Sequence, residues 1–334
     1  MPNDRARLPG PRVVPVHPDN SRTRTGSLTL MATAAPSTPS HTPFGRVGTA
    51  MVTPFDSERA LDLDAAQRLA SHLVDHGSDA LVISGTTGES PTTNDKEKAD
   101  LLRVVLEAVG DRATIVAGVG SFDTAHTVSA ARAAEAIGAH GLLVVTPYYN
   151  KPPQDGIRQH FTAVADATGL DVMLYDVPAR TAMKIATETL LQLAEHPRIV
   201  AVKDAKGDLA ATTKVLANTD LAIYSGADEL NLPLLAMGAV GMVSVVGHVA
   251  GDDYRAMVEA VDVGDLASAR EIDRRLVPAV EAIMTRTQGA IMAKAALKLT
   301  GVLEHATMRL PLVDATPEQV DWLTTDLKTA GLLR

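Results

Sequence analysis

The sequence contains no cysteine, and it has only four Phe, five Tyr and one Trp among 334 residues. Without cysteine, disulfide bonds, thiolate catalysis, cysteine-ligated zinc and iron–sulfur clusters are all excluded. The shortage of aromatic residues predicts an aliphatic core, so a cluster of tyrosines would be informative. The net charge of −9 argues against nucleic acid as a partner, because such proteins need a basic face to neutralise phosphates.

The N-terminal residues differ in composition from the rest. Residues 1–46 carry six arginines against two aspartates, and prolines interrupt any apolar periodicity there. No apolar segment of the kind found in secretory signals is present. We interpret residues 1–43 as a disordered tail or as a spurious N-terminal extension, with the true start near Met31.

One uncharged stretch, residues 230–251, has the length of a membrane span. Several glycines, Pro233, Asn231 and His248 interrupt it. It is better interpreted as a short helix at 229–237, a turn, and a buried strand at 241–246. We therefore expect no contact with a membrane.

From Val47 onward, short β-branched runs alternate with Ala-rich segments of helical pattern. This alternation predicts βαβ units and a parallel sheet, hence the α/β class. Eight such units in about 220 residues fit a (β/α)8 TIM barrel better than an open doubly wound sheet. The predicted strands are 47–55, 80–85, 114–120, 141–149, 171–178, 199–205, 221–227 and 241–247.

The strand pattern stops after Gly264. Helical patterns follow at 265–285, 289–300 and 317–330. We therefore expect a catalytic barrel at 44–264 followed by a C-terminal α-helical domain at 265–334.

The active site of such a barrel lies at the C-terminal ends of the strands, and one predicted strand ends in Lys203. Both faces of a barrel strand are largely dry, and a buried ammonium is costly unless it is paired or deprotonated. A lowered pKa would make this amine a Schiff-base nucleophile. The alternative is a structural ion pair with an interior carboxylate. The other lysines, Lys206 included, are expected in loops or on polar helix faces.

Further polar groups follow neighbouring strands. The Gly85–Ser90 loop could present backbone N–H groups and two hydroxyls to a small anion such as a carboxylate, or it could be an ordinary turn capped by Ser90 or Thr92. Arg180 could clamp a carboxylate or form a surface salt bridge. Three of the five tyrosines are at the ends of the fourth and fifth strands, where they serve either as packing or as a proton relay. They are Tyr148, Tyr149 and Tyr175.

No metal site is predicted. His72 and His76 have i,i+4 spacing, but no third ligand accompanies them, and a zinc site needs at least three protein ligands. We interpret this pair as solvated histidines on a helix rim.

From about residue 44 to its end, the chain resembles the dihydrodipicolinate synthase family of the pyruvate-dependent class I aldolase superfamily. Five motifs carry the resemblance, in the order and at the spacing typical of that family. They are Gly85-Thr86-Thr87-Gly88-Glu89-Ser90, Thr146-Pro147-Tyr148-Tyr149-Asn150-Lys151-Pro152, Tyr175-Asp176-Val177-Pro178-Ala179-Arg180-Thr181, Val202-Lys203-Asp204-Ala205 and Ser225-Gly226.

The resemblance implies a cytoplasmic homotetramer, a dimer of dimers, that condenses pyruvate with L-aspartate 4-semialdehyde in lysine and diaminopimelate biosynthesis without a cofactor. Lys203 would form the Schiff base with pyruvate. The proton relay, the two substrate carboxylate sites and the remaining lining are implied as well. The relay would comprise Thr87, Tyr175 and a Tyr149 donated by the neighbouring subunit. Thr86 and Thr87 would hold the carboxylate of pyruvate, and Arg180 would hold the carboxylate of the semialdehyde. Gly226 and Val243 would line the site.

Two departures from the family pattern stand out. Asp176 replaces an asparagine that many members carry, and catalysis is expected to survive because its neighbours are intact. At the positions where regulated members bind inhibitory lysine, Lys98 would repel the ligand and Phe122 could not accept its hydrogen bonds. Feedback inhibition by lysine is therefore predicted to be weak or absent. The four positions concerned are Asp95, Lys98, Phe122 and His126.

Related activities remain as alternatives. N-acetylneuraminate lyase and the 2-keto-3-deoxy-sugar-acid aldolases share the lysine, tyrosine and glycine motifs. They usually lack the second threonine of the Thr86–Thr87 pair or the arginine at the position of Arg180. A barrel that kept the fold as a non-catalytic binding paralogue is a third alternative, but it would not require the complete set of site residues.

Overall fold

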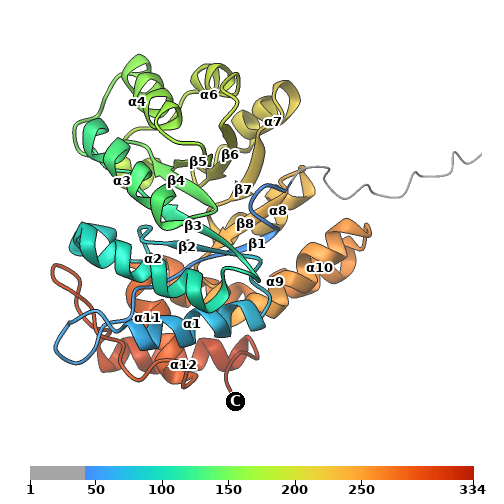
Figure 1. Cartoon of the computed structure of the whole chain (residues 1–334). Coiled ribbons are helices and arrows are strands. Elements are labelled where there is room, and N and C mark those ends of the chain that lie inside the picture. Colours follow the sequence, from blue (N-terminus) through green and yellow to red (C-terminus); the bar gives the residue numbers. More distant parts are fainter. Residues whose placement is uncertain (1–41) are drawn as a thin grey trace, which may run out of the picture. The chain divides into compact units, whose positions relative to one another are not determined.

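In the computed structural model, which describes residues 42–334, eight parallel strands close into a barrel surrounded by helices (Figure 1). The strand order follows the sequence, and β8 pairs in parallel with β1 to complete the ring. The expected TIM barrel is thus confirmed, whereas the interpretation of the N-terminal tail lies, up to residue 41, outside the described residues. The strands are β1 (Val47–Ala50), β2 (Ala80–Ile83), β3 (Thr114–Gly118), β4 (Gly141–Val145), β5 (Asp171–Asp176), β6 (Ile199–Asp204), β7 (Ala222–Ser225) and β8 (Gly241–Ser244).

All eight predicted strands are present, and each ends earlier than predicted. The run predicted at 141–149, for example, ends at Val145, and the next residue, Thr146, donates its backbone N–H to the Tyr175 carbonyl. The residues beyond each strand turn into the loops at the rim of the barrel. Their β-branched and aromatic side chains resemble strand residues, which is why the sequence pattern extends too far.

The helices between the strands cover the outside of the barrel (Figure 1). They begin where side chains satisfy the first free N–H groups: the Asn94 side chain and Glu97 form a capping box at the start of α2, for instance. Their bounds are α1 (Leu63–Asp75), α2 (Asp95–Val109), α3 (Thr124–Ile137), α4 (Gln154–Asp166), α5 (Pro178–Thr181), α6 (Thr187–Leu193), α7 (Leu209–Asn218), α8 (Asn231–Ala236) and α9 (Gly247–Asp262), with the short 3-10 helices η1 (Ser90–Thr92) and η2 (Asp228–Leu230).

The three predicted C-terminal helical segments are also present. They are α10 (Leu266–Val280), continued by the π-helical turn η3 (Glu281–Thr285), then α11 (Gly289–Leu299) and α12 (Pro317–Thr329). Helix α11 contacts α9 and α12, and its residues 289–297 are all buried. Within residues 42–334, no helix is both long enough and apolar enough to cross a membrane.

The buried residues are mostly Ala, Val, Leu and Ile, as the low aromatic content predicts. One of the few buried aromatic side chains, Tyr224 of β7, has a structural role. Its hydroxyl accepts a hydrogen bond from Phe44 N (3.0 Å) and donates one to the Gly45 carbonyl (2.9 Å). Tyr224 thereby ties the segment that precedes β1 to the barrel wall, away from the C-terminal ends of the strands.

Candidate active site

Lys203 faces the interior of the barrel from β6. Its neighbour Asp204 accepts a hydrogen bond from a threonine of α7, so it lies on the outer, helix-covered face. Because successive side chains of a strand point to opposite faces, Lys203 must point inward. The same holds in β5, where Asp176 bonds outward to the chain before α6 and Tyr175 is the register partner of Lys203.

The Lys203 amine is buried and, among residues 42–334, has no ionic partner. Its side chain is 4% exposed, and Nζ lies 4.4 Å from the centroid of the Tyr175 ring. Burial lowers the pKa of Lys203 to about 8; Asp228 opposes this shift and Arg180 adds to it. Within residues 42–334, the lysines that form ion pairs with carboxylates are Lys96, Lys206 and Lys294, and Lys203 is not among them. The alternative of a structural ion pair at Lys203 is therefore wrong.

The lowered pKa gives a pH dependence to the reaction of this amine with a ketone. With a pKa of about 8, about one amine in ten is neutral at pH 7, against about one in 2,500 for an unperturbed lysine of pKa about 10.4. We expect the initial rate of adduct formation with pyruvate to rise about 50-fold from pH 6 to pH 8 and less than twofold from pH 8 to pH 9.5. Borohydride trapping at short times measures this rate, and a steady rise up to pH 10 would contradict the expectation.

A cavity of about 260 Å³ opens at the rim beside Tyr175. Since one water occupies about 30 Å³ of the liquid, this volume accommodates a small carboxylic acid. Lys203 and Thr87 do not line it; Lys203 lies against the ring of Tyr175, and Thr87 is buried next to Thr86. Pro91, Leu143 and Val145 also line this cavity, although no motif in the sequence points to them.

The Gly85–Ser90 loop is a tightly hydrogen-bonded turn at one wall of this cavity. The Thr53 hydroxyl donates to the Gly88 carbonyl (2.6 Å), and Glu89 N donates to the Thr86 carbonyl (3.1 Å). Neither Ser90 nor Thr92 caps the helix that follows, because Asn94 does. The interpretation of the loop as a turn capped by Ser90 or Thr92 is therefore wrong.

Tyr175 and Arg180 both line this cavity. Burial raises the pKa of the Tyr175 phenol, while the positive charge of Arg180 and the side chain of Thr86 oppose this shift. Arg180 is exposed in the single turn of α5, and within residues 42–334 it forms no salt bridge. Its guanidinium is thus available to an anion in the cavity, and the alternative of a surface salt bridge is wrong.

Gly226 lies against the stem of Lys203, and Val243 shares the inner face of the barrel with it. A Cβ atom added to Gly226 would stand 2.8 Å from Lys203 Cγ, so only glycine leaves room for the lysine stem. Lys203 is in register with Tyr224 of β7, which is in register with Gly241 of β8. Val243, two residues further along β8, therefore shares the inner face with Lys203.

Tyr149 does not join the other tyrosines inside this chain. It is 92% exposed, and its φ of 70° is left-handed. Tyr148, by contrast, lines the cavity and contacts Phe122 edge-on, with 5.5 Å between the ring centroids. Of the predicted relay, one chain brings only Thr87 and Tyr175 to the interior.

The expectation that lysines other than Lys203 occupy loops or polar helix faces is wrong for Lys294, whereas Lys206 lies in a loop as expected but is not exposed there. Lys206 is buried behind β6, with Nζ 3.0 Å from Asp204 and 3.8 Å from Asp176. Burial raises the pKa of Asp176 to about 6, and the charge of Lys206 opposes that rise. Lys294 is fully buried in α11, whose sides are all covered. Tertiary packing, which a local pattern does not report, buries both lysines.

A second cavity, of about 380 Å³, contains the four positions singled out for lysine inhibition. Burial lowers the pKa of the Lys98 ammonium, and Asp95 and Glu97 oppose this. His126 Nε2 is 3.6 Å from Asp95 Oδ1. The lining includes Asp95, Lys98, Phe122, His126 and Tyr148.

Comparison with known proteins gives consistent results. Residues 43–330 match the model of the dihydrodipicolinate synthetase family. The chain is 66% identical over 290 residues to a 4-hydroxy-tetrahydrodipicolinate synthase of Kineococcus radiotolerans, covering 87% of this chain and 94% of that protein. It is 61% identical to 4-hydroxy-tetrahydrodipicolinate synthase 2 of Streptomyces coelicolor, covering 89% and 99%.

Among solved structures, a DHDPS of Cyanidioschyzon merolae with lysine bound superposes with a TM-score of 0.84. Its sequence is 42% identical, and the match covers 87% of this chain and 99% of that one. The similarity therefore includes the whole barrel and the C-terminal helices.

Proposed function

The chain belongs to the dihydrodipicolinate synthetase family, and from this premise and the site geometry we infer that it condenses pyruvate with L-aspartate 4-semialdehyde. This is the activity of a 4-hydroxy-tetrahydrodipicolinate synthase, a lyase of lysine and diaminopimelate biosynthesis. The observation that carries the inference is the buried, unpaired amine of Lys203 against the ring of Tyr175.

We propose that Lys203 Nζ attacks the carbonyl carbon of pyruvate and that water leaves to give an imine. The imine carbon draws electrons from the adjacent methyl group, so that loss of a methyl proton gives an enamine. The enamine carbon attacks the aldehyde of the semialdehyde, forming the new C–C bond. The amino group of the semialdehyde then displaces Lys203 from the imine carbon and closes the ring, so that one water is released overall.

The two substrate carboxylates would occupy opposite parts of the cavity wall. Thr86 and Thr87 offer hydroxyl and backbone donors from the Gly85–Ser90 loop, which suits the pyruvate carboxylate. The free guanidinium of Arg180 suits the semialdehyde carboxylate, since arginine binds carboxylates with two parallel hydrogen bonds. Gly226 and Val243 would confine the reacting atoms next to Lys203. Neither a cofactor nor a metal takes part in this proposal.

Proton transfer is assigned to Thr87, Tyr175 and a Tyr149 from a second copy of the chain. The nearly complete exposure of Tyr149 supports this assignment, because an aromatic side chain at a barrel rim gains by inserting into a neighbour. The assembly proposed is a cytoplasmic homotetramer built as a dimer of dimers. A monomer would lack one member of the relay.

Mixing subunits tests the donated tyrosine. We expect Tyr149→Phe and Lys203→Met, each nearly inactive alone, to regain activity when mixed and reassembled. Each mixed dimer has one site that combines an intact Lys203 with the partner's intact Tyr149 and one site that lacks both. With random pairing of equal amounts half of the dimers are mixed, so up to about a quarter of the sites should recover. Turnover after mixing, compared with each variant alone, measures this recovery. If mixed oligomers are shown to form and activity does not return, Tyr149 acts in the site of its own chain or takes no part in the reaction.

Weak or absent inhibition by lysine remains a prediction. In the 380 Å³ cavity, a lysine ligand would meet the ammonium of Lys98 and the apolar ring of Phe122, and like charges in a partly buried cavity repel. We expect 1 mM L-lysine to leave most of the steady-state rate intact. Half-maximal inhibition at a sub-millimolar concentration would contradict this prediction.

A comparison of substrates tests the proposed function itself. The Thr86–Thr87 pair and Arg180 favour the semialdehyde over the acyl-sugar substrates of related aldolases. Purified protein should release the condensation product from pyruvate and L-aspartate 4-semialdehyde in a coupled assay. It should not cleave N-acetylneuraminate or a 2-keto-3-deoxy sugar acid at a comparable rate. Faster turnover of either sugar acid would overturn the proposed substrate.

A further inference from the structure

The loop that carries Thr86 and Thr87 is fastened to the C-terminal part of the chain by one buried carboxylate. Glu89, two residues after Thr87, is 2% exposed, and its side chain points away from the cavity into the interior. We call the set of Glu89, Lys294 and Arg309 the Glu89 anchor. None of its three members lines the 260 Å³ cavity.

Both oxygens of Glu89 accept hydrogen bonds from residues more than 200 positions away in the sequence. Lys294 Nζ, from α11, donates to Oε1 at 2.5 Å, and both side chains are fully buried. The backbone N–H of Arg309 donates to Oε2 at 3.0 Å. A further bond from Lys294 Nζ to the Thr307 carbonyl, at 2.8 Å, ties α11 to the segment that follows it.

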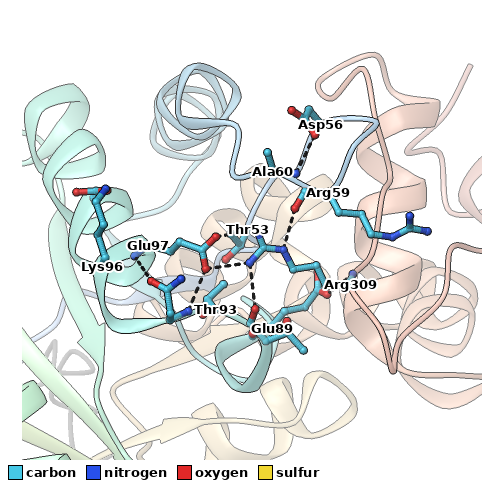
Figure 2. A network of polar contacts seen from close by, with 12 residues as sticks. Thr53, Asp56, Arg59, Ala60, Glu89, Thr93, Lys96, Glu97 and Arg309 are labelled. Carbon is cyan, nitrogen blue, oxygen red and sulfur yellow. Dashed lines mark hydrogen bonds and ion pairs between the residues drawn. The ribbon is translucent and has the colours of Figure 1, made fainter.

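The guanidinium of Arg309 holds the far end of the same turn (Figure 2). It donates to the Thr92 carbonyl at 3.0 Å and to both oxygens of Glu97 at 2.9 and 2.7 Å. Its Nε donates to the Arg59 carbonyl at 2.9 Å. Arg309 therefore connects the end of η1 and the start of α2 to the loop after β1.

Both cations contact one aromatic ring, that of Phe55. Lys294 Nζ is 4.2 Å and Arg309 Cζ is 4.1 Å from the centroid of the Phe55 ring, which is buried beyond the end of β1. Cations attract the face of an aromatic ring, more so when water is excluded. The position of Lys294 is thus fixed from two sides, by a carboxylate and by a ring.

The backbone of Glu89 explains why the loop needs an anchor. Its φ of 54° is left-handed, a conformation that a non-glycine residue adopts only when its surroundings impose it. A Glu89 side chain free of Lys294 would allow the turn to relax to an ordinary φ. Because Glu89 is two residues from Thr87, that relaxation would move the hydroxyl and N–H donors of the loop.

We propose that Lys294 and Arg309 are positioning residues for substrate binding: they fix the turn that presents Thr86 and Thr87 to the carboxylate of the keto acid. Lys294 acts through Glu89, whereas Arg309 acts through its backbone N–H to Glu89 and through its side chain on Thr92 and Glu97. The C-terminal helices thereby contribute to the affinity of a site that they do not touch. This inference rests on the proposed function, in which that loop holds the pyruvate carboxylate.

The test compares affinity for pyruvate with overall stability. Lys294→Met should raise the pyruvate concentration that half-saturates borohydride trapping on Lys203 at least tenfold. The KM of the semialdehyde should change less than twofold, because Arg180 belongs to another segment. Lys294→Met leaves a buried carboxylate without its cation, so the neutral double variant Glu89→Gln/Lys294→Met is made as well. If the single variant does not fold, the double variant replaces it in the test. We expect the double variant to raise the pyruvate concentration for half-saturation at least fivefold.

The matched control is Arg46→Met. Arg46 forms a two-pronged pair with Asp262, joining the segment before β1 to the end of α9, away from the C-terminal ends of the strands. Its loss should lower the melting temperature and leave half-saturation by pyruvate within twofold. If folded Lys294→Met or the double variant also binds pyruvate within twofold of the unaltered chain, the anchor is merely structural and the inference fails. If the unaltered chain forms no adduct on Lys203, the proposed function fails and takes this inference with it.

Discussion

Replacement of Lys203 by methionine is expected to lower turnover by a factor on the order of 10⁴ or more, as loss of a covalent nucleophile does in other enzymes. Lys206 and Lys294, whose side chains are also buried, cannot substitute because carboxylates hold their amines. Steady-state turnover with pyruvate and L-aspartate 4-semialdehyde measures the loss. Residual activity above about 1% of the unaltered rate would exclude Lys203 as the nucleophile.

The same substitution should stabilise the fold. Burial lowers the pKa of Lys203 to about 8 in the folded chain, so its charged form is disfavoured there relative to the unfolded chain. This cost is complete below pH 8 and disappears as the pH rises towards the unfolded pKa of about 10.4. We therefore expect the free energy of unfolding of Lys203→Met at pH 7 to exceed that of the unaltered chain by about 1–3 kcal/mol, and the difference to vanish near pH 10. Denaturant titration at the two pH values measures it. A less stable variant at pH 7 would show that burial does not penalise the charged amine.

Tyr175→Phe should lower kcat by a factor of about 10² to 10³, the range typical of a lost proton-transfer group. The phenyl ring keeps its contact with Lys203 Nζ, so pyruvate should still be trapped on Lys203. Steady-state kinetics combined with trapping separates the two effects. A kcat within fivefold of the unaltered chain would remove Tyr175 from the relay.

Tyr224→Phe is the matched control for this prediction. It removes a hydroxyl from the register partner of Lys203 in β7, where the hydroxyl binds Phe44 and Gly45. Losing these two buried hydrogen bonds should lower the free energy of unfolding by about 1–3 kcal/mol. Its kcat should stay within twofold, so that a loss specific to Tyr175 is attributable to the reaction.

The barrel and the position of Lys203 could be predicted from the sequence because both depend on local rules. Strands repeat with period two, and parallel strands meet at one edge, so Lys203 and Tyr175 had to lie at the same rim. The strand ends were placed too late, since residues such as Thr146 have strand propensity but serve the loops. Tyr148 lines the cavity and Tyr149 does not, because the backbone at Tyr149 is left-handed. No local sequence pattern predicts that conformation.

The buried charges could not be predicted, because their partners are distant in sequence. Glu89 and Lys294 are 205 positions apart, and the motif around Glu89 points only to a turn near the site. Lys206 lies in the loop after β6, and the sequence does not show that its side chain is buried between Asp176 and Asp204. The sequence offers one indication: Asp176 and Asp204 alternate with Tyr175 and Lys203, so both carboxylates point outward, where a buried cation could pair with them.

The most direct measurement is borohydride reduction of the unaltered chain in the presence of pyruvate, followed by peptide mass mapping. Reduction converts an imine into a stable secondary amine, which marks the reacting lysine. Formation of the imine at a buried, unpaired amine predicts one pyruvate-derived adduct per chain, on the peptide that contains Lys203. An adduct on any other lysine, or no adduct at all, would contradict it.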